Sequence, residues 1–335
     1  MGRTIDAAAA YVPRKRADGR RVAAADEDAF TLAATALERL PVGSASAPGP
    51  RRLLAVGDLP GSVEEDLPRF LGTPVSVHRV GTGAPALRRA LASIDEAPDG
   101  DPPVLLVAVD LASRGSAGPD GAVALRSTPN GALPTERVLA AVPEAGELSA
   151  EPLLRFGAPL ALADPARWVG DFTAATGDAS GPPSPESPVP PDGPVSQGAY
   201  IPRPRYLESV AARWRLEGER CGACGTVGFP PRGRCRSCGA ADGLAAWRLP
   251  RDGGVVVAST TIGPGGQPTE FDAQVAESGR YTVVLVDLAP GIRVTLQATD
   301  AASPPTVGAR VGTRLRRLYP MEGAWRYGRK AVPLS

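Results

Sequence analysis

The first half of the chain alternates between helical and strand-like patterns of apolar residues. Residues 25–40 and 84–94 repeat apolar positions at helical spacing, so both segments predict helices. Residues 51–58 and 102–113 contain short continuous apolar runs of the kind found in buried strands. Helices that alternate with such strands favour an α/β layer in which the strands pair in parallel.

The second half changes from one helix to a series of strands. Residues 205–216 predict a helix with one apolar face, formed by Leu207, Val210, Ala211 and Trp214. From residue 253 onwards, five short apolar segments are separated by glycine and proline turns, and we expect five strands there. Strands at this spacing fit a small barrel or sandwich.

A proline-rich segment separates the two halves. Residues 177–198 hold seven prolines and almost no aliphatic or aromatic side chain. Such a segment cannot bury enough apolar surface to offset the entropy lost on ordering, and prolines favour extended conformations. We therefore expect an interdomain linker at 177–198.

Composition and charge change the picture in two ways. The 335 residues are enough for two or three domains, and 43% hydrophobic with 22% charged residues is typical of globular proteins. No apolar run is long enough to span a membrane, and the alanine run near the start precedes its basic cluster, the reverse of a secretory signal. These features indicate a cytoplasmic protein.

The two halves differ in charge. Residues 1–198 carry 18 basic and 25 acidic side chains, whereas residues 199–335 carry 19 basic and 11 acidic side chains.

Acidic residues cluster at positions 26–28, where the first predicted helix begins. One of them, Asp26 or a neighbour, can cap the helix, and acids near a helix amino terminus are expected from the helix dipole. A metal site is the alternative interpretation of this cluster.

All four cysteines of the chain lie within CGACGTVGFPPRGRCRSCGA, residues 221–240. They form two CxxC pairs, Cys221 with Cys224 and Cys235 with Cys238, each followed by a glycine that eases a tight turn. In a reducing compartment such pairs favour a metal over disulfides, and Zn²⁺ suits four thiolates. Because four thiolates leave no open coordination position, we predict one structural zinc ion.

The carboxyl-terminal half resembles a known family. RYLESVAARWRL, CGACG, FPPR, CRSCG, YTVVLVDLAPGIRV and WRYGRKAVP, spread over residues 200–333, look like the zinc-ribbon/OB-fold proteins associated with acyl-CoA enzymes, first catalogued as a domain of unknown function. The resemblance implies a rubredoxin-like zinc ribbon followed by a five-stranded OB-fold barrel. It also implies that the chain docks onto a thiolase, an HMG-CoA synthase or a related aldolase, and assists acyl-CoA binding or transfer.

The amino-terminal half resembles the first half of a thiolase-fold HMG-CoA synthase. The resemblance rests on YVPRKR, DEDAFTLAATAL, HRVGTGAPALRRAL and LLVAVDLASR. Aligning Gly81-Thr82 with the family's active-site turn puts His78, the single histidine, where the nucleophilic cysteine is expected. A thioester needs a thiolate, and the fold needs two such halves, so the resemblance implies a degenerate domain without a catalytic residue.

Five arginines near the ribbon are candidates for contacts with CoA phosphates, because arginine binds phosphate through two hydrogen bonds. They are Arg203, Arg205, Arg213, Arg215 and Arg220. A solvated helix face is the alternative. A second basic and aromatic patch is formed by Arg314, Arg316, Arg317 and Tyr319.

The expected organisation is multidomain. A thiolase-like α/β half-domain at 1–176 precedes the linker, a helix with a zinc ribbon occupies 199–245, and an all-β OB-fold domain occupies 246–335. The expected function is that of a non-catalytic accessory or scaffold subunit for a thiolase or HMG-CoA synthase-type enzyme. Two alternatives stay open: a nucleic-acid-binding zinc-ribbon/OB-fold protein, whose affinity would fall steeply with salt, and an acyltransferase with an atypical active site.

Overall fold

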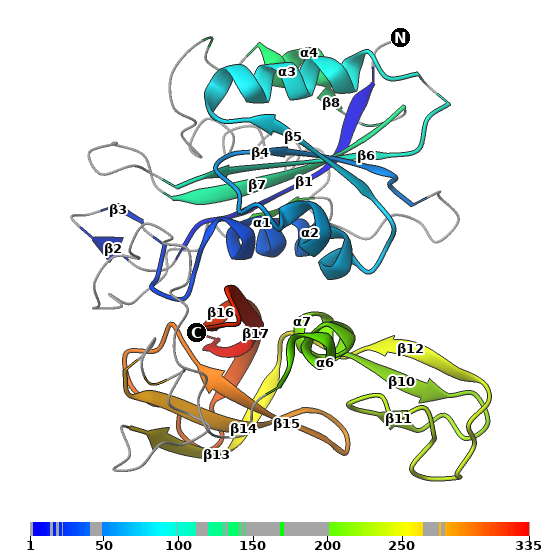
Figure 1. The fold of residues 1–335 in the computed structure, drawn as a ribbon, viewed down its shortest axis with the longest axis vertical. Helices are drawn as coiled ribbons and strands as arrows, with labels where there is room; N and C mark the ends of the chain where they lie inside the picture. Colours follow the sequence, from blue (N-terminus) through cyan, green and yellow to red (C-terminus); the bar gives the residue numbers. More distant parts are fainter. Residues whose placement is uncertain are drawn as a thin grey trace. The chain divides into compact units, whose positions relative to one another are not determined.

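The fold was analysed in a computed structural model of the full chain, which forms two compact units, Met1–Ser184 and Pro185–Ser335 (Figure 1). The structure describes residues 3–13, 16–17, 20–21, 23–40, 49–98, 100–111, 120–129, 131, 133–140, 142, 144, 168–170, 201–263, 275 and 279–334. The predicted linker at 177–198 lies outside these residues. In the part of the chain that is described, no helix is both long and apolar enough to cross a bilayer.

The amino-terminal unit is built on one mixed sheet. Its strand order is β5-β4-β6-β7-β1-β8, and β9 pairs with β1. The strands are β1 (Thr4–Tyr11), β4 (Arg52–Val56), β5 (Ser76–Gly81), β6 (Val104–Asp110), β7 (Gly121–Thr128), β8 (Leu133–Pro134) and β9 (Trp168–Gly170), with a separate two-stranded pair of β2 (Arg16–Ala17) and β3 (Arg20–Arg21). Strand β4 pairs in parallel with β5 and β6, as the sequence predicts, whereas β7 runs antiparallel to β6 and β1. The sheet is therefore mixed.

Helices cover both faces of this sheet. Helices α3 (Gly83–Asp95) and α4 (Thr135–Leu139) lie on one face, and α1 (Ala29–Glu38) and α2 (Val63–Leu71) lie on the other (Figure 1). Leu87, Leu91 and other apolar side chains of α3 share a core with those of β1, β4, β6 and β7. This three-layer arrangement confirms the predicted α/β architecture.

The acidic cluster at 26–28 serves the structure of α1. Asp28, rather than Asp26, is the N-cap: its carboxylate accepts from the Thr31 backbone N–H at 2.9 Å, and the Thr31 hydroxyl accepts from Asp28 N. The Glu27 carboxylate accepts hydrogen bonds from the Tyr11 hydroxyl and the Ala24 backbone. Two of these three acids are thus engaged in local hydrogen bonds that account for their position.

The carboxyl-terminal unit begins with two short helices where the sequence predicts one. Helix α6 (Arg203–Glu208) ends at Ser209, and α7 (Val210–Arg215) follows it. Ser209 has φ −88° and ψ 0°, and its hydroxyl donates to the Tyr206 carbonyl at 2.8 Å. A serine hydroxyl that donates to a carbonyl of the preceding turn competes with the backbone hydrogen bonds of the helix, which explains the break.

A small antiparallel sheet carries the cysteines. Its order is β11-β10-β12, with β10 at Glu217–Cys221, β11 at Val227–Gly228 and β12 at Leu244–Arg248. These strands are short, and the last four residues of β12 are exposed. The sheet therefore has little apolar core of its own.

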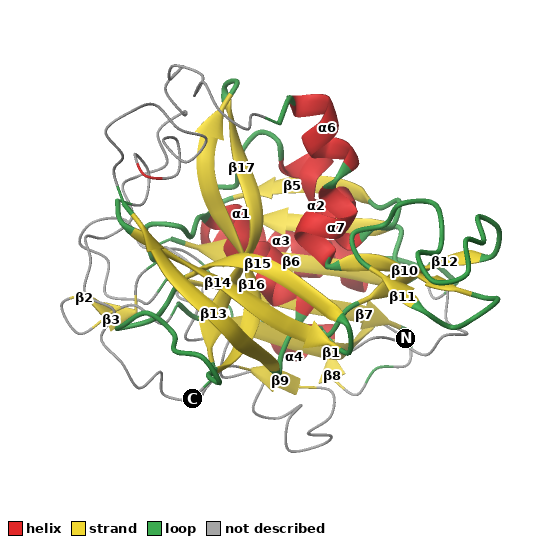
Figure 2. Ribbon diagram, turned by 90° about the horizontal axis from the view of Figure 1, so that it is seen from below, coloured by secondary structure: helices red, strands yellow, loops and turns green. Residues whose placement is uncertain are grey.

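Beyond it, the chain closes into a five-stranded barrel in the order β13-β14-β15-β17-β16 (Figure 2). The strands are β13 (Gly254–Ile262), β14 (Tyr281–Ala289), β15 (Ile292–Ala298), β16 (Arg310–Met321) and β17 (Ala324–Pro333). All neighbours are antiparallel except β15 and β17, which are parallel. All five predicted strands form, and the barrel prediction is confirmed in preference to a sandwich.

The barrel core extends to the ribbon side of the unit. Val256, Val284 and Val286 are fully buried at its centre, and Leu216 and Leu249, which flank the ribbon in sequence, pack in the same cluster. The ribbon is thus anchored at both of its ends by apolar residues that belong to the barrel core.

Candidate metal centre

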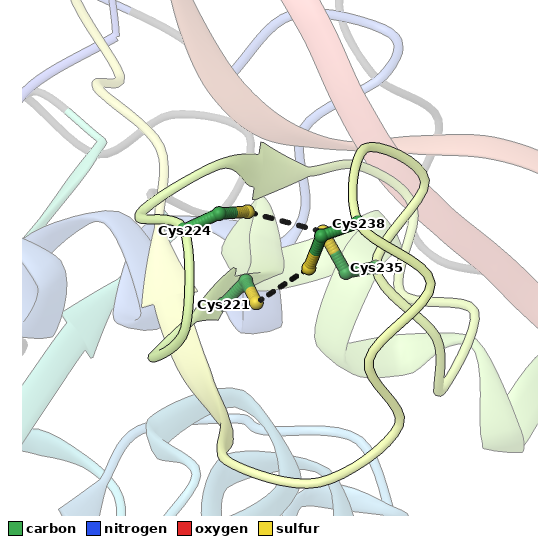
Figure 3. A group of neighbouring side chains, drawn as sticks. All are labelled: Cys221, Cys224, Cys235 and Cys238. Carbon is green, nitrogen blue, oxygen red and sulfur yellow. Dashed lines mark hydrogen bonds between the residues drawn. The ribbon is translucent and has the colours of Figure 1, made fainter.

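Two turns of the chain bring the four cysteine sulfurs together. Cys221 ends β10 and Cys224 follows in the turn, whereas Cys235 and Cys238 come from the long loop between β11 and β12 (Figure 3). The four sulfurs lie within 4.8 Å of one another, with 3.7 Å between those of Cys221 and Cys238 and 3.6 Å between those of Cys224 and Cys235. The structure therefore joins all four predicted ligands.

Each knuckle is closed by the glycine that follows its second cysteine. Gly225 N donates to the Cys221 carbonyl at 2.8 Å, and Gly239 N donates to the Cys235 carbonyl at 3.0 Å. The two glycines have φ of 72° and 76°, a left-handed conformation that disfavours residues with a Cβ. The glycine in each CxxCG motif is thus required by the turn that aims the thiols.

The arrangement fits a tetrahedral zinc ion. With Zn–S bonds of about 2.3 Å, the sulfurs of a tetrahedral site are separated by about 3.8 Å. The distances of 3.7 and 3.6 Å between paired sulfurs are close to this value. Four cysteine sulfurs are also the donor set of structural zinc sites, which are closed to substrate. When bound, the ion would hold the two knuckles together.

Hydrogen bonds favour the ionised form of two of the four thiols. Cys224 Sγ lies 3.2 Å from Thr226 Oγ1, and hydrogen bonds with the side chain and backbone of Thr226 lower the pKa of the Cys224 thiol to about 6. The backbone N–H groups of Cys238 and Ser237 lower the pKa of Cys235. At Cys238 a backbone hydrogen bond with Ala240 is outweighed by the side chains of Cys224, Cys221 and Cys235, which raise the pKa of that thiol to about 11. The four thiols therefore do not all ionise together on their own, and a bound cation would be needed to hold all four as thiolates.

A buried carboxylate that sequence reasoning missed fixes the FPPR loop against this centre. Glu219 on β10 accepts hydrogen bonds from the backbone N–H groups of Arg232, at 3.0 Å, and Gly233, at 3.2 Å. Beside it lies a pocket of about 110 Å³ whose lining includes Phe229 and Pro230. The signal in the sequence was that Glu219 lies two residues before the predicted ligand Cys221, on the same side of a strand. A carboxylate buried at such a position needs hydrogen-bond donors.

The five candidate arginines lie on three elements and form no single cluster in the contacts that the structure shows. Arg205 is exposed and pairs with Glu208 at 2.7 Å. The Arg213 guanidinium donates to the Ser209 hydroxyl at 2.8 Å.

The remaining three occupy different surroundings. Arg215 pairs with Glu217 at 3.1 Å, and Arg220 lies over the Trp247 ring, 4.8 Å from its centroid. The side chain of Arg203 is exposed. Their contact with CoA phosphates remains a prediction.

The basic and aromatic patch predicted on the late strand is not an open surface. Arg316 and Arg317 are 0% and 1% exposed. Arg316 pairs with Asp300 at 2.9 Å, and Arg317 lies over the Trp325 ring at 4.0 Å. The prediction of an open patch here was wrong, because these two consecutive residues point to opposite faces of the strand and both are covered by other side chains.

His78 lies in the middle of β5 with its side chain exposed. Gly81 ends that strand, and Thr82 is the N-cap of α3. His78 is therefore three residues before the strand-to-helix turn that the thiolase resemblance singles out. Its lack of a catalytic role remains a prediction.

The geometry defines a class: a protein with a four-cysteine zinc ribbon joined to a closed five-stranded barrel. Residues 209–242 match the family model of the ChsH2 rubredoxin-like zinc ribbon domain. A DUF35 domain-containing scaffold protein of Methanocaldococcus jannaschii is 29% identical over 134 residues, which are 39% of this chain and 90% of that protein. The carboxyl-terminal half is thus similar to DUF35 zinc-ribbon proteins, as its motifs predict.

Solved structures with similar parts include the Ltp2-ChsH2(DUF35) aldolase. It has 24% identity and a TM-score of 0.31, and the match covers 40% of this chain and 96% of that one. An HMG-CoA synthase complexed with CoA has 16% identity and a TM-score of 0.33, over 39% of this chain and 43% of that one. Scores this low assign neither fold nor function to this chain.

Proposed function

We propose that this chain is a non-catalytic accessory subunit that binds a thiolase or HMG-CoA synthase-type enzyme and assists acyl-CoA binding or transfer. The observation that carries the proposal is the pairing of a closed four-cysteine centre with a barrel in a region related to a protein described as a scaffold. A metal held by four thiolates has no position for substrate, so the ribbon supports structure and docking instead of chemistry.

The distribution of nucleophiles supports the same proposal. Every cysteine of the chain belongs to the metal centre, and the single histidine, His78, stands on an exposed edge strand. Carbon–carbon bond chemistry on thioesters needs a thiolate and a base held within hydrogen-bonding distance. An active enzyme bound to this chain would supply them.

The barrel is the part proposed to assist acyl-CoA. Five strands, complete closure and parallel pairing of the third strand with the fifth support its assignment as an OB fold. We propose that the barrel and the arginines of α6 and α7 hold the CoA portion of the ligand. The amino-terminal unit would then serve as a thiolase-like scaffold for the active partner.

A zinc ribbon and a barrel can also bind nucleic acid, but the patch predicted on β16 for that purpose is not exposed. Arg316 and Arg317 are buried in side-chain contacts, so β16 does not present the basic and aromatic strip that single-stranded nucleic acids require.

Affinity purification of the intact, zinc-loaded chain from its own host tests the proposal. Stoichiometric recovery of a thiolase-fold enzyme, identified by mass spectrometry, is the expected result. Recovery of the chain alone or of nucleic acid would contradict it. Thioester cleavage by the purified chain, abolished in His78→Ala, would instead establish an enzyme.

A further inference from the structure

Strand β12 leaves a tryptophan on the surface of the zinc ribbon. Trp247 is 41% exposed, although it belongs to a regular strand. Trp214, by contrast, is 1% exposed, and its indole N–H donates to the Tyr206 hydroxyl and the Tyr327 carbonyl. The same unit thus buries one tryptophan completely and presents another to solvent.

Arg220 accompanies Trp247 on the same face of the sheet. In the β10–β12 register, Gly218 lies opposite Trp247 and Arg220 lies opposite Ala245, so Arg220 and Trp247 are diagonal neighbours. The guanidinium carbon of Arg220 is 4.8 Å from the centroid of the indole ring. Gly218 is buried beneath Gly228 and Phe229, so the exposed part of this face comes from Arg220, Ala245 and Trp247.

This ribbon face, defined by Gly218, Arg220, Ala245 and Trp247, lies at the edge of the sheet. Strand β12 is last in the order β11-β10-β12, and no other described strand pairs with its outer edge. Arg248, the next residue along, is 59% exposed. An edge strand with an exposed aromatic ring is a surface that another protein can cover.

We infer that the ribbon face is the docking surface for the partner enzyme, which presents an apolar pocket bordered by carboxylates. This inference rests on the proposed function and adds the site of contact. Tryptophan and arginine are the residues enriched where binding energy concentrates in protein interfaces. The charge complementarity is set by Arg220: its guanidinium, already stacked on the ring, offers a planar set of donors to a carboxylate.

A single-stranded nucleic acid fits this face less well than a protein does. Such ligands are held by several aromatic rings that stack on successive bases along a basic groove. The ribbon face offers one ring, Trp247, and the neighbour that shares its face on the same strand is Ala245. A single exposed aromatic side chain is typical of an interface residue that inserts into a pocket of a partner protein.

Binding of zinc-loaded, full-length variants to the purified partner enzyme, measured by isothermal titration calorimetry, tests the inference. Trp247→Ala is expected to weaken binding by at least about 30-fold, as for a central interface residue. Val307→Ala is the matched control, because Val307 is 69% exposed elsewhere in the same unit; it should bind like the parent. Zinc content and melting temperature should be unchanged in both variants, since neither residue is a ligand or buried.

Arg220→Met tests the charge. It removes the guanidinium but keeps a long apolar side chain over the ring, so it should weaken binding and reduce the salt dependence of the affinity. Equal binding by the parent and Trp247→Ala would overturn the inference and leave the proposed function intact. If the parent protein bound no thiolase-fold enzyme, both the inference and the proposed function would be refuted. Salt-sensitive binding of an oligonucleotide that Trp247→Ala abolishes would also overturn it.

Discussion

Tyr206 fastens helix α6 to the barrel through a hydroxyl group with three hydrogen bonds. The hydroxyl donates to the Tyr327 carbonyl at 3.0 Å, accepts from the Tyr327 backbone N–H at 2.6 Å, and accepts from the indole N–H of Trp214 at 3.0 Å. These bonds use its one proton and both of its lone pairs. The substitution Tyr206→Phe removes the three bonds and keeps the buried ring.

The expected cost follows from which groups lose a partner. The indole N–H of Trp214 retains the Tyr327 carbonyl, at 3.1 Å, so both of those groups stay satisfied. The Tyr327 backbone N–H loses this acceptor at a position where Tyr327 is 5% exposed. A typical hydrogen bond contributes about 0.5–1.5 kcal/mol net, so loss of the three bonds of this hydroxyl should destabilise the unit by about 1–3 kcal/mol.

Differential scanning calorimetry of the zinc-loaded full chain measures the effect. The transition of this unit is identified by the release of zinc to a chromophoric chelator, because the ribbon belongs to the same unit. Tyr319→Phe is the control, since Tyr319 is partly exposed, and its stability should change by less than about 0.5 kcal/mol. Equal stability of Tyr206→Phe and Tyr319→Phe would refute the account of the hydroxyl.

Three further variants test the metal centre and the barrel. Cys235→Ser should lower the zinc content, measured by mass spectrometry, and the melting temperature; a variant as stable as the parent would exclude a structural zinc. Gly239→Ala should cost about 1 kcal/mol and weaken zinc retention in a chelator competition, because φ is 76° there, and unchanged retention would contradict this. Asp300→Asn should cost about 1.5–3 kcal/mol in thermal denaturation, because it removes the carboxylate that pairs with the buried Arg316 guanidinium at 2.9 Å; a loss below 1 kcal/mol would contradict it.

Features encoded by short stretches of sequence could be predicted. The two CxxCG motifs carry both the ligands and the glycines with positive φ, so the knuckles needed no knowledge of the rest of the chain. The five barrel strands were likewise evident from apolar segments bounded by glycine and proline. In each case, the local sequence contains most of the interactions that define the element.

Features that depend on distant partners could not be predicted. Strand β1 is rich in alanine, which has low strand propensity, and it forms because β7, more than a hundred residues later, pairs along its length. The same pairing makes the sheet mixed. The apolar and polar residues within β1 and β7 predict neither the formation of β1 nor the direction of β7.

The basic and aromatic patch predicted on β16 was wrong for a related reason. A basic residue in a strand shows its charge in the sequence but not the direction of its side chain or its partner. Arg316 is buried against Asp300, whereas Arg220 stands on an exposed sheet. The difference lies in the register of β10 and β16 with their neighbours, which the sequence alone does not reveal.

The small ribbon can present a face for docking because its stability comes from elsewhere. A three-stranded sheet normally buries one face, and a tryptophan on that face would be buried in the core. Here, metal ligation can hold the knuckles, and Leu216 and Leu249 anchor the two ends of the ribbon in the barrel core. The sheet therefore does not need Trp247 for its own folding. Trp247 and the stacked Arg220 are therefore available to a partner, and in the proposed docking Trp247 would enter an apolar pocket while Arg220 pairs with a carboxylate of the partner.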